Sequence, residues 1–282
     1  MEPTEISLGI SPCPNDTFAF YHLLNRKDLP FKFRLVIADV EQLNTMVLSG
    51  LLDVSKVSYG LAAKVLDRYL ILDTGSALGR GCGPLILARE QISKRQLKNC
   101  VVAIPGVNTT ATLLLRLYQP DIEKMEPMLF SRIPQAILDR DVDAGCVIHE
   151  TRFTYQDMGL VCIDDLGLWW ENKTHMPLPL GGIIARRSLP LNVIKEIQMG
   201  IRESIEFALE HPDATEAFIR QHAQEMSQAV QKKHIGLYVN EFSISLGEEG
   251  RQAVQTLFHL AARQGLCEPV SVQKDALFLT GE

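Results

Sequence analysis

Short apolar stretches alternate with helical stretches through roughly the first two-thirds of this chain, and this alternation is the strongest constraint on its fold. Strands that alternate with helices favour parallel sheets covered by helices. Further along, from about residue 191, isoleucines recur at helical spacing, with a break at His211–Asp213. The sequence therefore predicts an α/β fold. The expected strands are residues 5–10, 33–38, 70–72, 84–88, 101–104, 144–148, 161–163 and 182–185, and helices are expected to start near residues 17, 40, 60, 109, 133 and 166.

Two segments of similar composition, residues 83–89 and 180–186, both end in Ala-Arg. We interpret them as the places where the chain enters and leaves an inserted unit. The expected organisation is a large lobe of residues 1–88 and 184–282 and a small lobe of residues 89–183.

Composition narrows the class of partner. The chain has 282 residues, 46% hydrophobic and 22% charged, with a net charge of -6, which suits a globular protein with a substantial core. It lacks a dense Lys/Arg cluster, so nucleic acid and anionic membranes are poor partners. It also lacks an apolar stretch of membrane-spanning length and the basic start of a signal peptide. We expect a cytoplasmic protein with a small-molecule substrate and no membrane insertion, and the sequence carries no signal for oligomeric state.

The cysteines point away from disulfides and metals. None of the six forms a CxxC pair or a short Cys/His ligand spacing. We therefore expect reduced thiols, as in cytoplasmic proteins, and no metal site. Cys13 is more simply explained by loop packing than by nucleophilic catalysis, since no paired base is evident beside it.

The segment Ser11–Phe18 follows the first expected strand. Its two prolines keep the backbone out of helix, and Asn15 or Asp16 is expected to cap a helix that begins at Thr17. A stiff loop at the carboxyl end of a strand, in front of a helix N-terminus, is where open α/β sheets bind small ligands. The alternative is a rigid turn without a ligand. Ser11, Asn15 and Asp16 are thus candidate cleft residues.

His149 follows the apolar strand that ends at Ile148. An imidazole at the carboxyl end of a strand can face a ligand crevice and act as a base near neutral pH. The alternative is a hydrogen-bonded histidine with no catalytic part. A zinc motif of the HExxH type is excluded because position 153 is Phe153.

Two further pairs suit an anionic ligand. Thr109 and Thr110 open a helix, where hydroxyls and unpaired amides favour a carboxylate or phosphate; the alternative is ordinary capping by Asn108 or Thr109. Lys56 and Ser58 share a face if residues 53–59 are extended and can hold a carboxylate; the alternative is an exposed lysine at a strand edge.

The glycine-rich segment 79–83 lacks a nucleotide-loop pattern and is better explained as a flexible approach to the second lobe. Arg80 within it is retained as a possible cleft residue that reaches an anion. Trp169 and Trp170 are expected to pack in a core.

Ten short blocks of the sequence, spread over nearly the whole chain, carry a family resemblance. They are Ser11–Phe18, Asp39–Asn44, Lys56–Tyr59, Gly75–Gly81, Thr109–Ala111, Ile148–Tyr155, Leu166–Trp170, Leu178–Gly181, Tyr238–Asn240 and Gly247–Gly250. In these residues and in this order the chain resembles the 1,4-dihydroxy-6-naphthoate synthase family of the futalosine route to menaquinone, and the coverage makes the resemblance specific.

This resemblance implies a two-lobed fold like that of type II periplasmic binding proteins, with the ligand cleft between the lobes. It implies a carbon–carbon lyase that converts cyclic dehypoxanthinyl futalosine to 1,4-dihydroxy-6-naphthoate and dihydroxyacetone, with no metal or organic cofactor. The family's proton-abstracting histidine matches His149, which Glu150 follows. Its substrate contacts match two short segments, which comprise Lys56, Val57, Ser58, Thr109 and Thr110.

Two alternatives remain open on the same fold. One is a small-molecule solute-binding or sensing protein. Secreted binding proteins need an export signal, and this chain does not show one. The other is the related chorismate dehydratase, against which the segment Ser11–Asp16 and the pair His149-Glu150 argue.

Overall fold

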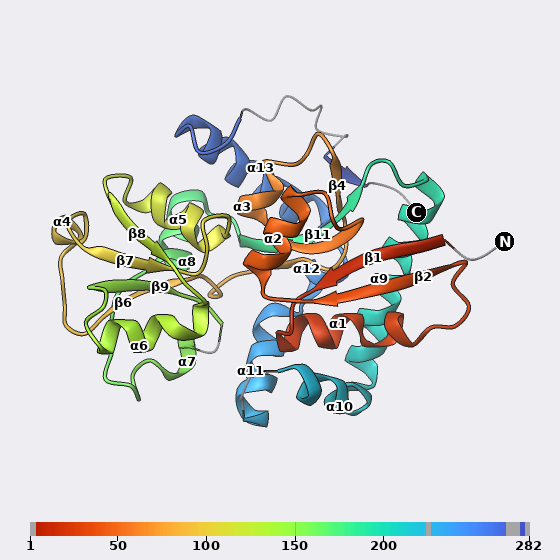
Figure 1. The fold of residues 1–282 in the computed structure, drawn as a ribbon, viewed down its shortest axis with the longest axis horizontal. Coiled ribbons are helices and arrows are strands. Elements are labelled where there is room, and N and C mark those ends of the chain that lie inside the picture. The colour runs from red at the N-terminus through yellow and green to blue at the C-terminus, as the bar shows by residue number, and fades with distance from the viewer. Residues whose placement is uncertain (1–3, 150, 224–226, 269–276, 280–282) are drawn as a thin grey trace.

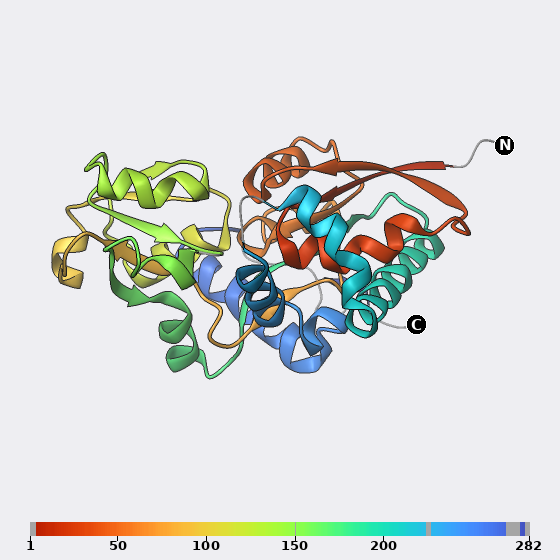
Figure 2. The same ribbon diagram turned by 90° about the horizontal axis from the view of Figure 1, so that it is seen from below.

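The computed structural model describes residues 4–149, 151–223, 227–268 and 277–279, and its strands form two separate sheets (Figure 1). The sheets belong to two bodies that lie side by side (Figure 2). The first and last described strands both join the larger sheet.

The larger sheet has the strand order β12-β4-β11-β3-β1-β2, and β5 pairs with β11 beside it. Strand β1 is parallel to β2 and β3, whereas β11 is antiparallel to β3, β4 and β5. The strands are β1 (Thr4–Ile10), β2 (Phe31–Ile37), β3 (Val54–Ser58), β4 (Tyr69–Leu72), β5 (Ala77–Gly79), β11 (Leu178–Arg186) and β12 (Phe278–Leu279).

The smaller sheet has the order β10-β6-β9-β7-β8. Its strands are β6 (Leu85–Ala88), β7 (Val101–Ile104), β8 (Lys124–Pro127), β9 (Ala144–Val147) and β10 (Val161–Asp165). Strand β7 is parallel to β8 and β9, but β6 is antiparallel to β9 and β10. The predicted parallel sheets are therefore mixed. Strands β6 and β11 each enter their sheet from the other body, so no crossover helix within one sheet sets them parallel to their neighbours.

The pairing of β6 and β11 bears on the expected lobe boundaries. Strand β6 pairs only with strands of the smaller sheet, and β11 pairs only with strands of the larger one, among the residues described. The passages between the bodies then lie before these strands, at residues 80–84 and 175–177. We propose lobe boundaries there, instead of after residue 88 and before residue 184.

Helices cover both sheets. Those predicted near residues 40, 60, 109, 133 and 166 begin within one residue of the prediction, and Asp39 and Asp165 cap two of them through their carboxylates. The helices of the larger body are α1 (Pro14–Asn25), α2 (Val40–Leu48), α3 (Tyr59–Ala62), α9 (Leu191–Glu210), α10 (Pro212–His222), α11 (Gln228–Tyr238), α12 (Glu241–Ile244) and α13 (Gly247–Arg263). Those of the smaller body are α4 (Lys94–Leu97), α5 (Thr110–Tyr118), the 3-10 helix η1 (Phe130–Arg132), α6 (Ile133–Leu138), α7 (Thr151–Thr154) and α8 (Leu166–Thr174). Among the described helices, none is long and apolar enough to cross a membrane.

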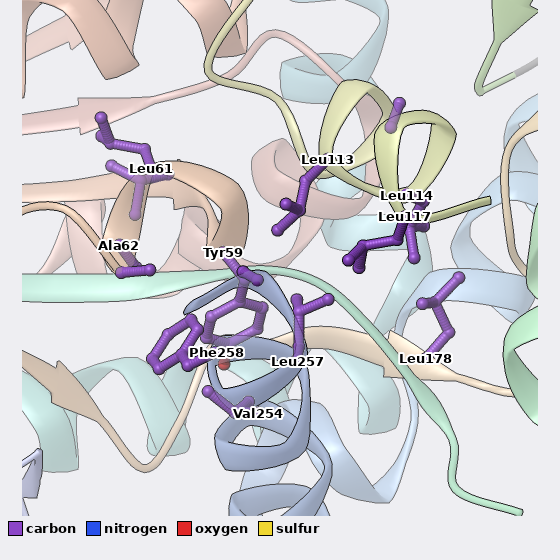
Figure 3. Packing of buried hydrophobic residues seen from close by; sticks show 14 of the residues in the cluster. Tyr59, Leu61, Ala62, Leu113, Leu114, Leu117, Leu178, Val254, Leu257 and Phe258 are labelled. Carbon is purple, nitrogen blue, oxygen red and sulfur yellow. The ribbon is translucent and has the colours of Figure 1, made fainter. Parts of the chain in front are cut away.

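One apolar cluster joins the two bodies. Figure 3 shows Leu257 and Phe258 of α13 beside Tyr59, with leucines of α5 nearby. The same buried cluster continues to Ile86 in β6 and Cys146 in β9 of the smaller sheet. This apolar contact excludes water and holds the two bodies together on the side of α13. A polar site between the bodies therefore has to lie on another side of the interface.

Candidate active site

A pocket between the two bodies gathers most of the side chains that the sequence analysis singled out. It contains about 630 Å³ of empty space when its opening to solvent is counted. The larger body contributes the loop after β1, the first turn of α1 and β3, and the smaller body contributes the start of α5 and the residues after β9. The lining consists of Ser11, Asn15, Asp16, Val40, Lys56, Val57, Ser58, Ala77, Cys82, Thr109, Thr110, Ala111, Ile148, His149, Leu180, Gly181 and Tyr238.

The loop after β1 leads directly into α1. The helix begins at Pro14 with Cys13 as its N-cap, and proline suits this position because its missing N–H would have had no partner. The predicted cap at Asn15 or Asp16 is therefore wrong. Asp16 Oδ2 instead accepts hydrogen bonds from the Ser11 backbone N at 3.2 Å and from Ser11 Oγ at 2.6 Å, which holds the loop against its own helix.

Lys56 and Asp16 form a buried ion pair in the pocket wall. Lys56 Nζ lies 2.7 Å from Asp16 Oδ1, and the two side chains are 8% and 2% exposed. The ammonium also donates to the carbonyl of Gly75 at 3.2 Å. Lys56 is thus not the exposed lysine of the alternative interpretation. Because Asp16 already balances its charge, a ligand carboxylate has to compete with Asp16 for it.

Ser58 is the better placed hydrogen-bond donor. Strand β3 is extended, and the hydroxyl of Ser58 accepts a hydrogen bond from Asn44 Nδ2 at 3.2 Å. Asn44 Oδ1 in turn accepts from the Ser58 backbone N at 3.0 Å. A hydroxyl can accept and donate at the same time, and the Ser58 proton has no acceptor among the described residues, so it is available to a molecule in the pocket.

The hydroxyls of the threonine pair are engaged within the protein. Thr109 is the N-cap of α5 and accepts from the Thr112 backbone N at 3.2 Å. Thr110 Oγ1 accepts from the Gly60 backbone N at 3.0 Å and donates to the Leu180 carbonyl at 2.5 Å. The capping role proposed as the alternative is correct for Thr109, and Thr110 connects the two bodies.

The groups at the start of α5 that can bind an anion are backbone N–H groups. Among the described residues, the amides of Thr110 and Ala111 have no hydrogen-bond acceptor. Both residues line the pocket, and a helix N-terminus carries a partial positive charge. These two amides, rather than the threonine hydroxyls, are therefore available to a carboxylate.

His149 follows β9 and has a left-handed backbone with a φ of 59°, which is uncommon for a residue with a side chain and is often found at functional sites. Its ring packs against Phe130 with the ring centroids 4.8 Å apart. Cys13 Sγ lies 3.9 Å from each of its ring nitrogens. The adjoining Glu150 lies outside the described residues.

The sequence analysis missed His234 and Tyr238 on α11. Tyr238 lines the pocket, and His234 stacks on His149 with centroids 5.5 Å apart and an interplanar angle of 14°. Burial lowers the pKa of His234 well below its usual value, and the nearby His149 and Lys56 lower it further. The sequence around His234 carries no local signal, since only tertiary contacts bring α11 to the pocket. Tyr238 did occur in one of the ten blocks that resemble the family.

Arg80 lies outside the pocket lining, which corrects its assignment as a possible cleft residue. Its side chain is half-exposed, and its Nη2 donates to Glu249 Oε1 at 3.0 Å and to the His175 carbonyl at 3.2 Å. Trp170 is fully buried and donates to the Pro177 carbonyl at 3.1 Å, as its interpretation as a core residue predicts.

The chemistry that these groups offer is that of a base beside hydrogen-bond donors. The pocket supplies one imidazole, one serine hydroxyl with an available proton, two amides and a balanced ion pair. In the described part of the chain, no three His, Cys, Asp or Glu side chains are grouped so as to hold a metal ion. Such a set can bind an anionic molecule and remove a proton from it.

Comparison with known proteins places these observations in a family. A family model described as menaquinone biosynthesis matches residues 6–263. A 1,4-dihydroxy-6-naphthoate synthase of Thermus thermophilus is 46% identical over 265 residues, which cover 94% of this chain and 96% of that protein. A protein of the same name from Streptomyces coelicolor is 44% identical over 272 residues, with the same coverage of both chains.

The fold has solved counterparts. The alkanesulfonate-binding protein SsuA from Xanthomonas axonopodis pv. citri, solved with MOPS, superposes with a TM-score of 0.71 over 100% of both chains. At 14% sequence identity this likeness concerns the fold alone. It confirms the prediction of a two-lobed fold like that of the periplasmic binding proteins.

Proposed function

The chain belongs to the menaquinone-biosynthesis family and is similar to its 1,4-dihydroxy-6-naphthoate synthases over nearly its whole length, and we propose that it is a carbon–carbon lyase. The proposed reaction converts cyclic dehypoxanthinyl futalosine to 1,4-dihydroxy-6-naphthoate and dihydroxyacetone. The observation that carries the proposal is an imidazole, that of His149, at the wall of a pocket between the bodies.

His149 is the proposed general base. The substrate is a spirocyclic ketone with sugar hydroxyls and an aryl carboxylate, and a neutral imidazole can take a proton from it near neutral pH. Loss of that proton starts a retro-aldol-like cleavage of a carbon–carbon bond. The cleavage releases dihydroxyacetone and leaves an aromatic ring, so aromatisation draws the reaction forward.

The other pocket groups would hold the substrate in place for this step. The amides of Thr110 and Ala111 would bind its carboxylate, and the hydroxyl of Ser58 would donate to one of its oxygens. Lys56 and Asp16 would keep the α1 loop and β3 in fixed positions around it. Orientation of this kind supplies a large part of the rate gain in enzymes that lack a metal or an organic cofactor.

The direct test is turnover. Purified protein is incubated with the cyclic substrate, and formation of the naphthoate is followed by its absorbance. Binding of the naphthoate without turnover would identify a solute-binding or sensing protein on the same fold. Turnover of chorismate instead would identify the related dehydratase.

The carboxylate site can be tested at a single position with two substitutions. Thr110→Val removes the hydroxyl but keeps the backbone N–H, whereas Thr110→Pro removes both. Proline fits the first helical position, and the extended backbone of Thr109 (φ -74°, ψ 153°) permits a proline after it. We expect Thr110→Pro to weaken binding of the naphthoate by at least about 10-fold more than Thr110→Val does, because a hydrogen bond to a charged group contributes roughly 1.5–3 kcal/mol.

The matched ligand control is 1,4-dihydroxynaphthalene, which lacks the carboxylate. Thr110→Val is expected to weaken both ligands equally, because that hydroxyl bonds to Gly60 and Leu180 and not to a ligand. Titration calorimetry under reducing conditions measures all four combinations. If the two ligands lost equal affinity in Thr110→Pro as well, the start of α5 would not be the carboxylate site.

Separation of the two bodies is expected to admit the substrate. On the pocket side the bodies touch where α3 meets the start of α5, and a Cβ added to Gly60 would lie 2.8 Å from the Thr109 carbonyl oxygen. Because backbone cannot yield easily, Gly60→Ala should hold the bodies apart. We expect wild-type protein to contract when it binds the naphthoate, and Gly60→Ala to contract less and turn over at least about 10-fold more slowly.

Small-angle scattering with and without the naphthoate measures this contraction. Gly236→Ala is the matched control, since a Cβ at Gly236 meets nothing within 4 Å. An unchanged radius of gyration in the wild type, together with normal turnover of Gly60→Ala, would show that the bodies need not move.

A further inference from the structure

A second histidine lies directly behind the proposed base. His234 of α11 is 1% exposed, and its ring stacks on that of His149. It also contacts the ring of Tyr238, with centroids 4.6 Å apart. Because Tyr238, Asn15 and His149 all line the pocket, the buried ring of His234 forms the layer that supports this part of the pocket wall.

The ion pair determines which nitrogen of His234 carries the proton. Asn15 Nδ2 donates to Asp16 Oδ1 at 2.8 Å, and Lys56 holds the same carboxylate oxygen. The amide oxygen of Asn15 therefore faces His234, and His234 Nε2 lies 3.0 Å from it. Since an amide oxygen only accepts, Nε2 is the protonated nitrogen. Nδ1 then carries the lone pair, and it has no partner among the residues described.

His234 is held neutral by its surroundings. Burial disfavours its charged form, and the positive charge of Lys56 and the neighbouring His149 act in the same direction. Among the described residues, the other titratable groups that the contacts place near the two rings are the Cys13 thiol, the Asp16 carboxylate and the Tyr238 phenol. Asn15 separates the carboxylate of Asp16 from the ring of His234, so no carboxylate in the described part of the chain hydrogen-bonds to His234.

We propose that His234 is a positioning residue for His149. Its neutral ring supports the imidazole of His149 in the left-handed turn after β9 and keeps water from the buried side of that imidazole. Exclusion of water disfavours an imidazolium, so a larger fraction of His149 is unprotonated and able to accept a proton at a given pH. The effect on turnover rests on the proposed function, whereas the effect on the titration of His149 does not.

The test that needs no substrate is an NMR titration of the histidine rings. In the wild type, His234 is expected to show the Nε2-protonated neutral form throughout, from about pH 5 to pH 9. In His234→Ala, water can fill the vacated space, so the pKa of His149 should rise by about half a unit or more. In His234→Phe a flat ring still excludes water, so the pKa of His149 should stay close to that of the wild type.

Kinetics supply the second readout. His234→Ala is expected to lower kcat by about 10-fold with little change in KM, because it affects the base more than the binding groups. It should also move the acidic limb of the kcat/KM profile to higher pH, and His234→Phe should restore most of the rate and the position of that limb. The control is His22→Phe, since His22 also stacks on a ring, that of Phe207 at 4.2 Å, but lies outside the pocket lining.

Two results would overturn the inference. One is an identical titration of His149 in wild type and His234→Ala. The other is a wild-type His234 that titrates near pH 6–7 or carries its proton on Nδ1. This second result needs no variant, so it can be obtained even if His234→Ala does not fold. Absence of turnover in the wild type would instead refute the proposed function and leave the NMR result to decide the role of His234.

Discussion

Replacing His149 with asparagine is expected to lower turnover by about 10²–10⁴-fold, the usual contribution of a positioned general base, while the fold is retained. Asparagine is the informative choice because the residue has a φ of 59°, a conformation that asparagine tolerates better than alanine does. A loss of rate in His149→Asn therefore reports on the imidazole and not on backbone strain. The measurement is kcat with the cyclic substrate, with circular dichroism to show that the variant is folded.

Chemical rescue sharpens this test. In His149→Gly the glycine can also adopt the left-handed backbone conformation, and the substitution leaves a space in the pocket wall that free imidazole can occupy. Added imidazole is expected to restore part of the lost turnover, in proportion to the neutral fraction of the added base. Rescue that fails at every pH, in a variant that still binds the naphthoate, would argue that His149 orients the substrate and does not take its proton.

Cys13 provides the matched control for this position. Its sulfur lies 3.9 Å from both ring nitrogens of His149, so a cysteine nucleophile with a histidine base is the competing arrangement. General-base catalysis by His149 predicts that Cys13→Ala keeps turnover within a few-fold of wild type. Abolished turnover in Cys13→Ala, with substantial turnover left in His149→Asn, would reverse the two roles.

Most of the order of strands and helices was predictable because its signals are local. Asp39 and Asp165 stand directly before helices and cap them, so the starts of α2 and α8 follow from the neighbouring residues alone. Strands β3, β5, β8 and β12 were not among the expected strands. Strand β8, for example, is a mostly exposed edge strand, Lys124–Pro127, with no apolar alternation. The strand directions were also not predictable, since they depend on where the chain passes from one body to the other.

The candidate site was predictable where a polar residue follows or ends a strand. Ser11 follows β1 and Ser58 ends β3 in the larger sheet, whereas His149 follows β9 in the smaller sheet. The carboxyl ends of parallel strands meet at one edge of each sheet, and both edges face the pocket. The remaining site contacts depend on partners far away in the chain. Asn15 is 219 positions from His234, and Arg80 is drawn to Glu249, 169 positions later. No local sequence pattern indicates such pairs, which is why His234 was missed and Arg80 was wrongly assigned to the cleft.

The buried ion pair should dominate the stability of the pocket. Lys56→Met removes the ammonium and leaves the Asp16 carboxylate, only 2% exposed, without a cation. Removal of one partner of a buried pair typically costs about 3–5 kcal/mol, because the remaining charge stays desolvated. We expect the free energy of unfolding of Lys56→Met to fall by about this amount in urea titrations, with no ligand present.

Two companion variants separate the lost cation from the lost side chain. Arg80→Met breaks an exposed pair, with side chains 50% and 57% exposed, and should cost less than about 1 kcal/mol because solvent screens that pair. The double variant Lys56→Met with Asp16→Asn removes both charges and should recover much of the stability lost in Lys56→Met alone. Recovery follows because the remaining amide no longer needs a counterion, although Ser11 and Asn15 still contact it. If the double variant is as unstable as Lys56→Met, the lost stability comes from the packing of the lysine stem. If Lys56→Met itself loses less than about 1 kcal/mol of unfolding free energy, water reaches the Asp16 carboxylate.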